Sequence, residues 1–310
     1  MGTPEFAVAP LRVLLEEGHE IAAVVTQPDR PKGRKRVLTP PPVKVEALAH
    51  GLEVLQPEKL RGSDAVERIR ALQPDLIVTA AYGQILPKAV LEAPRLGCIN
   101  VHASLLPKYR GGAPIHYAVM NGDPVTGVTI MYMEEGLDTG DMISKVELPI
   151  GDDDTTGTMF GKLSAAGAEL LRRTLPGLLA GTIAAEPQND AEAIYSPNIK
   201  REQELVDWSR SAVAIWNHIR GLNPFPGAYT LWNGEVLKLW GSEKPSAGTG
   251  AHAAAAAAPG TVLQVTERGV EVQTGAGTLW LKELQPAGKK AMPAAELRNG
   301  GAMKPGTVLG

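Results

Sequence analysis

Three polar residues near the middle of the chain have types suited to a reaction centre. Asn100 and His102 alternate along the apolar segment 99–103, so in a strand their side chains leave the same face, about 6–7 Å apart. Asp138 follows the next apolar segment. An amide can donate to a developing oxyanion, an imidazole can accept a proton or stabilise charge, and a carboxylate can orient the imidazole. The spacing fits a catalytic centre and a hydrogen-bond cluster that closes a sheet equally well.

Elements of alternating type surround these residues. Short segments rich in Val, Ile and Leu predict buried strands at 21–26, 52–55, 75–80, 98–101 and 127–133. The intervening segments predict helices at 8–17, 43–49, 65–72, 87–91 and 113–120, followed by a long helix at 156–179. This alternation predicts an α/β fold with a doubly wound, mostly parallel, Rossmann-like sheet over residues 1–185. We expect Asn100, His102 and Asp138 to meet at the carboxyl edge of that sheet, where such folds bind ligands.

The last third of the chain has a different pattern. Residues 186–204 are predicted to form a polar linker, and residues 205–310 a second domain. Short strands are expected at 229–231, 236–240, 261–266, 270–274 and 278–283, with a hairpin turn at Asn233-Gly234. Five such strands are typical of a small, open, OB-like β-barrel. The alanine-rich segment 245–260 is predicted to be a surface loop.

The composition argues against a membrane protein, a disulfide-bonded protein and a metal site. The net charge is −3, and no apolar run approaches the roughly 20 residues that span a membrane. The single cysteine, Cys98, excludes an internal disulfide, and six scattered histidines show no metal-ligand spacing, so no metal is expected. We therefore predict a cytoplasmic monomer. One feature is unusual, because the turn-like Gly2-Thr3-Pro4 follows Met1 directly where such a domain normally opens with a strand. We expect either a sheet without its first strand or a start several residues further upstream.

Longer motifs around the polar trio are more specific. The chain resembles the 10-formyltetrahydrofolate-dependent formyltransferases in Asn100-Val101-His102, Ser104-Leu105-Leu106-Pro107, Arg110-Gly111-Gly112, Ala113-Pro114-Ile115 and Leu137-Asp138-Thr139-Gly140-Asp141. The resemblance extends over nearly the whole chain. It implies that Asn100, His102 and Asp138 are catalytic, that 10-formyltetrahydrofolate is the co-substrate, and that Ser104, Leu105, Leu106 and Pro107 contact the folate.

The residue types suit the implied reaction. Formyl transfer is the attack of an amine on an activated formyl carbon through a tetrahedral intermediate that carries an oxyanion. The Asn100 amide would donate to that oxygen. His102 would act as an acid/base or as an electrostatic stabiliser, and Asp138 would be its partner. The sequence leaves the protonation state and the proton route of His102 open.

The resemblance also bears on the amine acceptor. Segments 222–229 and 284–292 are similar to the C-terminal domain of the family members that act on methionyl-tRNA. The basic segment 27–36 carries five cations against one carboxylate, and its prolines and Gly33 predict a projecting loop. It resembles the insertion with which those members contact tRNA. The resemblance thus implies initiator methionyl-tRNA as partner, contacted by Lys32, Arg34, Lys35 and Arg36.

Further cations could add a phosphate-tracking face to the second domain, namely Arg220, Arg268, Lys289, Lys290 and Arg298. Three other functions remain open. The first is a sugar-nucleotide N-formyltransferase with the same chemistry. The second is a formyltetrahydrofolate hydrolase, in which Asp138 would activate water. The third is an RNA-binding module without catalysis.

Overall fold

The computed structural model describes residues 1–33, 35–246, 257–298 and 303–310 of the 310-residue chain. The chain divides into two compact units. The first unit holds residues 1–114, 126–148 and 160–197, and the second holds 115–125, 149–159 and 198–310. Along the described residues, no helix combines the length and the hydropathy needed to cross a membrane.

The first unit is built on a sheet. Its strands are β1 (Val24–Val25), β2 (Arg30–Lys32), β3 (Val37–Thr39), β4 (Val54–Leu55), β5 (Ile77–Thr79), β6 (Cys98–His102), β7 (Val125–Tyr132) and β8 (Met142–Pro149). β1 pairs with β4 in parallel, and β5, β6, β7 and β8 form a four-stranded sheet. Gly2 joins the two pieces, because it forms a parallel bridge to Ala80 and its N–H donates to the Val25 carbonyl at 3.0 Å.

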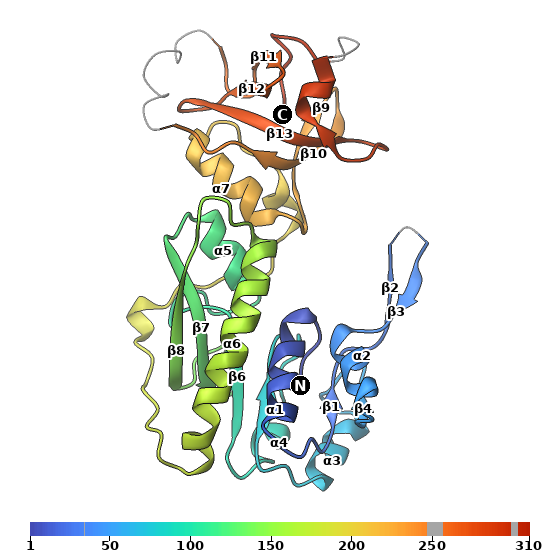
Figure 1. Cartoon of the computed structure of the whole chain (residues 1–310), viewed down its shortest axis with the longest axis vertical. Coiled ribbons are helices and arrows are strands. Elements are labelled where there is room, and N and C mark those ends of the chain that lie inside the picture. The colour runs from blue at the N-terminus through green and yellow to red at the C-terminus, as the bar shows by residue number, and fades with distance from the viewer. Residues whose placement is uncertain (34, 247–256, 299–302) are drawn as a thin grey trace. The chain divides into compact units, whose positions relative to one another are not determined.

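Helices connect and cover these strands (Figure 1). They are α1 (Val8–Glu16), α2 (Pro42–Ala49), α3 (Asp64–Ala71), α4 (Lys88–Leu91), α5 (Pro114–Met120) and α6 (Thr156–Leu179), with short 3-10 turns η1 (Glu5–Ala7) and η2 (Asp190–Glu192). α6 lies very close to β6, since a Cβ at Gly167 would stand 2.9 Å from the Val101 side chain. Val101 therefore faces α6. Because side chains alternate along a strand, Asn100 and His102 leave the opposite face of β6.

The α/β prediction is confirmed, with corrections in detail. β6 pairs with β5 in parallel but with β7 antiparallel, where a parallel strand was expected from the apolar run 127–133. A run of buried apolar residues does not carry strand direction, so this error is inherent in the pattern. β8 was missed, because its mixed exposed and half-buried positions break the apolar pattern. The expected loop at 27–36 contains β2, which forms a hairpin with β3.

The second unit contains an antiparallel sheet and a further helix, in addition to residues 115–120 of α5, which belong to this unit. Its elements are η3 (Arg201–Glu204), α7 (Ala212–Leu222), β9 (Ala228–Trp232), β10 (Glu235–Ser242), β11 (Val262–Thr266), β12 (Gly269–Gln273), β13 (Thr278–Pro286), β14 (Met292–Pro293) and η4 (Ala294–Arg298). The strand order is β11-β12-β13-β10-β9, with β14 on β13. The five predicted strands are all present. Within the described residues β9 and β11 do not pair, so the sheet is open.

The core of the second unit lies between α7 and this sheet. The Ser211 hydroxyl caps the helix by accepting the Ala214 N–H. Ile215, Ile219 and Leu222 then recur at helical spacing and are almost fully buried. They pack with strand residues such as Leu239 and Leu281, which have no exposed surface. The core is thus formed by one apolar helix stripe against one apolar sheet face.

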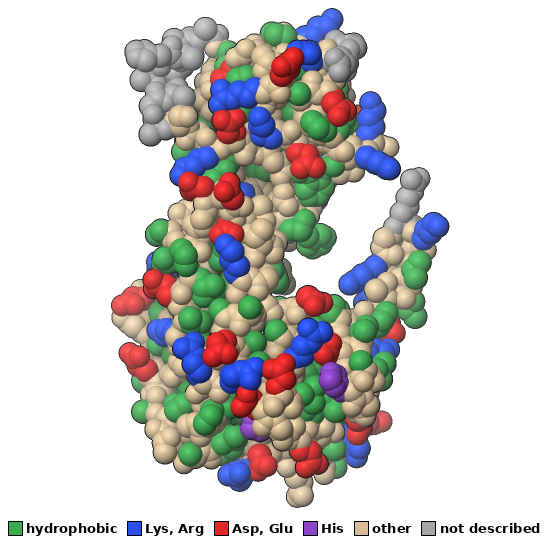
Figure 2. All heavy atoms as spheres, in the orientation of Figure 1, with side chains coloured by type: hydrophobic (Ala, Val, Ile, Leu, Met, Phe, Trp, Pro, Cys, Tyr) green, Lys and Arg blue, Asp and Glu red, His purple; other side chains and the backbone are tan. Residues whose placement is uncertain are grey.

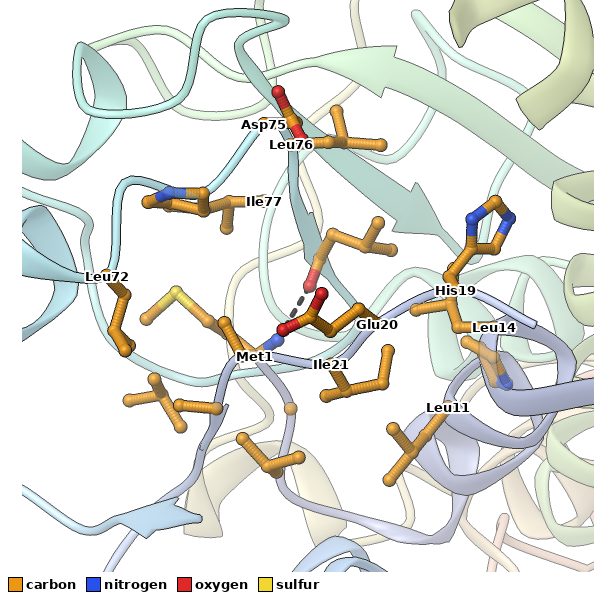
Figure 3. Close-up of a pocket in the computed structure, with 18 of the residues that line it drawn as sticks. Met1, Leu11, Leu14, His19, Glu20, Ile21, Leu72, Asp75, Leu76 and Ile77 are labelled. Carbon is orange, nitrogen blue, oxygen red and sulfur yellow. Dashed lines mark hydrogen bonds between the residues drawn. The ribbon is translucent and has the colours of Figure 1, made fainter. Parts of the chain in front are cut away.

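A cavity of about 390 Å³ separates β1 from β5 beside Met1. Leu11, Ile21 and Leu72 lie around it (Figure 3). The Met1 amine donates to the Val78 carbonyl at 2.6 Å, drawn as the dashed line, and the Met1 carbonyl accepts the Ala80 N–H at 2.9 Å. Met1 is thus in strand register with β5. Within the described chain, the main-chain groups of Leu76, one residue before β5, have no hydrogen-bond partner.

Candidate active site

Asn100 and His102 leave the same face of β6, as predicted from their alternation. His102 is buried and Asn100 is half-buried. On the other side of the strand, Val101 lies against α6. A parallel pairing with β5 and an antiparallel pairing with β7 hold both edges of β6. The backbone beneath these two side chains is therefore fixed from three directions.

The hydrogen bond of His102 determines its tautomer. Its Nε2 lies 3.0 Å from the Tyr109 carbonyl oxygen. Because a carbonyl only accepts, Nε2 carries the N–H in this arrangement. In the neutral imidazole the lone pair is then on Nδ1. That atom lies 3.8 Å from the Asp138 Oδ2, close enough for a charged pair once the ring is protonated.

Asp138 reaches His102 by a route that the sequence analysis did not foresee. The expectation that it follows a parallel strand to the carboxyl edge was wrong, because β7 is antiparallel and its Tyr132 pairs with Ile99 near the start of β6. The loop 133–141 returns to the site. Asp138 has a left-handed backbone with φ of 53°, and its Oδ2 accepts the Gly111 N–H at 2.8 Å. The carboxylate is mostly buried, with 16% of its side chain exposed.

Asn100 is oriented by its neighbour on β5. The Thr79 hydroxyl lies 2.9 Å from the Asn100 Oδ1 and also 3.1 Å from the Ile99 carbonyl. With Oδ1 turned to Thr79, the Asn100 NH₂ group has no partner among the described residues. It can donate to a bound molecule. A fixed amide donor beside an imidazole–carboxylate pair is the arrangement expected for stabilising an oxyanion while a proton moves nearby.

The segment Ser104, Leu105, Leu106 and Pro107 forms the loop after β6. Ser104 and Leu106 are almost fully buried. The Ser104 hydroxyl donates to the Lys108 carbonyl at 2.6 Å, and the Leu106 N–H donates to the Thr129 hydroxyl at 3.1 Å. Leu106 packs with Met131 and Met142. The side chains of Ser104 and Leu106 therefore pack inside the protein. Contact of this loop with a folate stays a prediction, and it concerns the loop backbone and the side chains of Leu105 and Pro107.

The structure adds a network of Arg110, Gln188 and Asp190, none of which has a role assigned from the sequence. Arg110 is 2% exposed and donates to Gln188 Oε1 at 3.0 Å and to Asp190 Oδ1 at 2.7 Å. Gln188 in turn donates to main-chain carbonyls of the loop that carries Asp138. Gln188 and Asp190 fall in the predicted linker, a polar stretch without periodicity. No sequence signal distinguished them from solvated residues.

The basic segment forms a hairpin that projects from the first unit (Figure 1). β2 and β3 pair from Arg30 with Thr39 to Lys32 with Val37. Lys32, Lys35 and Arg36 are exposed, and Figure 2 shows Lys and Arg side chains on this hairpin. Arg34, the fourth predicted contact, lies outside the described residues. The hairpin thus presents cations to solvent, as predicted for a loop.

The other predicted cations differ from one another. Arg220 is 8% exposed, donates to the Gly151 and Asp154 carbonyls and stacks on Trp216, so it serves the interior of the second unit. Its proposed place on a phosphate-tracking face is therefore wrong. Arg268 and Arg298 are exposed but paired with Glu243 and Glu267. Lys289 and Lys290 are exposed.

Two further observations concern Cys98 and the residues that could bind a metal ion. Cys98 is buried, and burial raises the pKa of its thiol to about 12, so it is no nucleophile at neutral pH. Within the ranges that the structure describes, no group of three or more His, Cys, Asp and Glu side chains is placed to hold a metal ion.

Comparison with known protein families identifies the class of the chain. A formyl transferase family model matches residues 1–175, and a model of the C-terminal domain of formyl transferases matches residues 198–302. Among solved structures, an N-formyltransferase from Helicobacter canadensis superposes with a TM-score of 0.68 at 18% identity, over 90% of this chain and 97% of that one. WlaRD, a sugar 3N-formyl transferase, gives a TM-score of 0.66 at 18% identity, over 93% and 97% of the two chains. These structures share the fold.

Sequence relatives are more specific. A methionyl-tRNA formyltransferase from Bacillus subtilis is 58% identical over 311 residues, which covers 100% of this chain and 96% of the relative. A methionyl-tRNA formyltransferase from Geobacillus thermodenitrificans is 58% identical over 313 residues, with the same coverage. The chain belongs to the formyl transferase family, in the branch of these methionyl-tRNA formyltransferases.

Proposed function

We propose that this protein transfers the formyl group of 10-formyltetrahydrofolate to the amino group of initiator methionyl-tRNA and so produces N-formylmethionyl-tRNA for translation initiation. The observation that carries the proposal is the site on β6. An amide donor, an imidazole with a free Nδ1 and a carboxylate 3.8 Å from that atom lie together. Full-length relatives at 58% identity bear the name of this activity, which supports the same acceptor.

The reaction requires one bond to form and one to break. The methionyl amine attacks the formyl carbon, and the carbonyl oxygen becomes an oxyanion that accepts a hydrogen bond from the Asn100 NH₂. His102 accepts the proton of the attacking amine on Nδ1. Collapse of the intermediate breaks the bond to N10 of the folate, which takes the proton. Asp138 stabilises the imidazolium between these two steps.

His102 keeps its orientation throughout this sequence. Its Nε2 proton stays on the Tyr109 carbonyl at 3.0 Å, so only Nδ1 exchanges protons. The Gly111 N–H, which donates to Asp138 Oδ2 at 2.8 Å, holds the carboxylate beside the ring. We propose that the folate lies along Ser104, Leu105, Leu106 and Pro107, contacting backbone and the Leu105 and Pro107 side chains. In this mechanism the Asn100 amide, and not a metal ion, stabilises the oxyanion.

Two domains share the work in this proposal. Residues 1–185 would bind the folate and perform the transfer, 186–204 would connect, and 205–310 would bind tRNA. Lys289 and Lys290 are the exposed cations that would follow tRNA phosphates. Every step is supplied by one chain, so we propose a monomer. A translation substrate also implies the cytoplasm as location.

The test is a formylation assay on purified protein with 10-formyltetrahydrofolate. Charged initiator tRNA, charged elongator tRNA, an amino sugar linked to a nucleotide and no acceptor are compared. We expect rapid product with initiator methionyl-tRNA alone. Product on the amino sugar would assign the chain to sugar-nucleotide formylation, and formate release without acceptor would assign it to hydrolysis.

The exposed cations of the hairpin supply a prediction for tRNA binding. Replacing Lys35 and Arg36 together by Glu should raise the KM for methionyl-tRNA about tenfold or more and leave the KM for the folate unchanged, because phosphate contacts are lost and repulsion is added. The loss should shrink in high salt. Steady-state kinetics at two salt concentrations measure both effects.

A control for this pair is the double replacement of Lys88 and Arg95 by Glu. Both belong to the same unit and are exposed. They lie outside the hairpin, so this variant should keep the KM for tRNA within about threefold of the parent. A changed KM for the folate in the hairpin variant would show that the hairpin has another role.

A further inference from the structure

Gln188 contacts the loop that carries Asp138 at two points. Its side-chain NH₂ donates to the Asp138 carbonyl and to the Gly140 carbonyl, each at 2.8 Å. Both protons of the amide are used on main-chain oxygens of one loop. The segment around Gln188 is itself held to the sheet, because Glu186 exchanges two hydrogen bonds with Met142, each of 2.8 Å. Gln188 thus ties the loop to a fixed strand.

Arg110 determines which way the Gln188 amide points. The Arg110 Nε donates to the Gln188 oxygen at 3.0 Å. Since a guanidinium only donates, the amide oxygen must face Arg110 and the NH₂ group must face the two carbonyls. Arg110 is 2% exposed, and its main chain bonds to the Ile194 carbonyl and the Ser196 N–H. The amide is therefore oriented by a buried donor whose main chain is hydrogen-bonded on both sides.

The loop needs such a tie at Asp138. Asp138, a non-glycine residue with φ of 53°, lies in the left-handed region, which is less favourable than ordinary backbone for a residue with a side chain. Its own carbonyl is the one that Gln188 binds. From this backbone the carboxylate reaches the Gly111 N–H at 2.8 Å and stands 3.8 Å from His102 Nδ1. A relaxed backbone would turn the carboxylate away from the imidazole.

We infer that Gln188 is a positioning residue for formyl transfer, which acts by holding Asp138 in the left-handed conformation that directs its carboxylate at His102. The inference rests on the proposed function, because the role of Asp138 does. Among the described residues, the Gln188 side chain bonds only to Arg110 and to the main-chain carbonyls of Asp138 and Gly140. Its contribution is to kcat and not to the binding of either substrate.

The variant Gln188→Glu isolates this role. Glutamate keeps the length, the shape and the acceptor for Arg110, but it replaces the NH₂ by an oxygen that repels both carbonyls. We expect kcat to fall about 10- to 100-fold, as for a displacement of about 1 Å in a reacting group. The KM for the folate and for methionyl-tRNA should change less than about threefold. Gln188→Met, whose side chain cannot donate to the two carbonyls, should lower kcat by a similar factor. It replaces Gln188→Glu in the test if the glutamate variant does not fold.

Asp190→Asn is the matched control. Asp190 binds the same guanidinium but no atom of the Asp138 loop, and its side chain is 83% exposed. We expect kcat of this variant within about twofold of the parent. An equal loss in Asp190→Asn and Gln188→Glu would show that the effect comes from Arg110 and would overturn the inference.

A double variant tests whether Gln188 acts through Asp138. In an Asp138→Asn background the carboxylate is already lost, so adding Gln188→Glu should lower kcat by less than about threefold. Independent, multiplying losses would overturn the inference. The parent protein separates the two proposals. If it makes no formylmethionyl-tRNA, the proposed function fails. If it is active and Gln188→Glu has normal kcat, only the positioning role fails.

Discussion

Asn100→Ala should lower kcat about 10²- to 10³-fold, the loss that follows removal of a single oxyanion donor in acyl transfer. The Asn100 NH₂ is directed by the contact of its Oδ1 with Thr79, at 2.9 Å, so alanine removes a preoriented donor. An interaction made mainly with the developing oxyanion lowers kcat and kcat/KM together. The KM for the folate should therefore stay within about threefold. Single-turnover formylation of methionyl-tRNA by the variant measures the chemical step directly.

The control for Asn100→Ala is Asn198→Ala. Asn198 is an exposed asparagine of the second unit, so the same substitution removes an amide from solvent. It should leave kcat unchanged. Asn100→Ala should also keep its unfolding midpoint within a few degrees, since Asn100 is half-buried and bonds one hydroxyl. A variant that retains more than a third of the parental kcat would show that another group meets the oxyanion.

Periodicity and short motifs predicted the helices, the strands and the faces on which the site residues lie. Alternation along β6 predicted the shared face of Asn100 and His102, and the long apolar period predicted α6 with the bounds that the structure has. The predicted strands of the second unit follow the same logic. A period of two or 3.6 residues reflects which face is buried, so it predicts elements and faces well.

Strand direction and loop paths were not predictable in this way. Burial looks the same in parallel and antiparallel strands, and so the direction of β7 was wrong and with it the expected path to Asp138. The contact of Asp138 with His102 was anticipated from the motif, while its basis lies in Gly111 and Gln188. Gln188 lies 50 residues away from the carbonyl it binds, and nothing local marks such a pair.

Arg220 shows a second limit of prediction from sequence, which concerns the burial of charged side chains. The residue type of a cation does not say whether its guanidinium is buried or exposed, so its neighbours in the sequence have to be considered. Arg220 follows Trp216 by four residues on α7, and this spacing places the two side chains on one face of the helix. The structure shows them stacked, 4.2 Å from guanidinium carbon to ring centre. The helical spacing to an aromatic residue was the available signal, and it indicated an internal role.

The remaining large effect is expected at Asp138. Asp138→Asn keeps an oxygen that can accept the Gly111 N–H, so the loop and the fold should persist. The charge that stabilises the His102 imidazolium is lost at a distance of 3.8 Å. We expect kcat to fall about 10²-fold or more, because replacing the carboxylate behind a catalytic histidine by an amide costs up to about 10⁴-fold in serine proteases.

Single-turnover formylation of methionyl-tRNA by Asp138→Asn measures the chemical step directly. The KM for the folate should stay within about threefold of the parent, because the carboxylate acts on His102 and not on a bound substrate. Asp75→Asn, which removes a carboxylate that is 72% exposed and paired with Arg95, should leave the rate unchanged. A loss that appears in KM instead of kcat would mean that Asp138 positions a substrate, and a variant that retains more than a third of the parental kcat would mean that His102 acts without its charge.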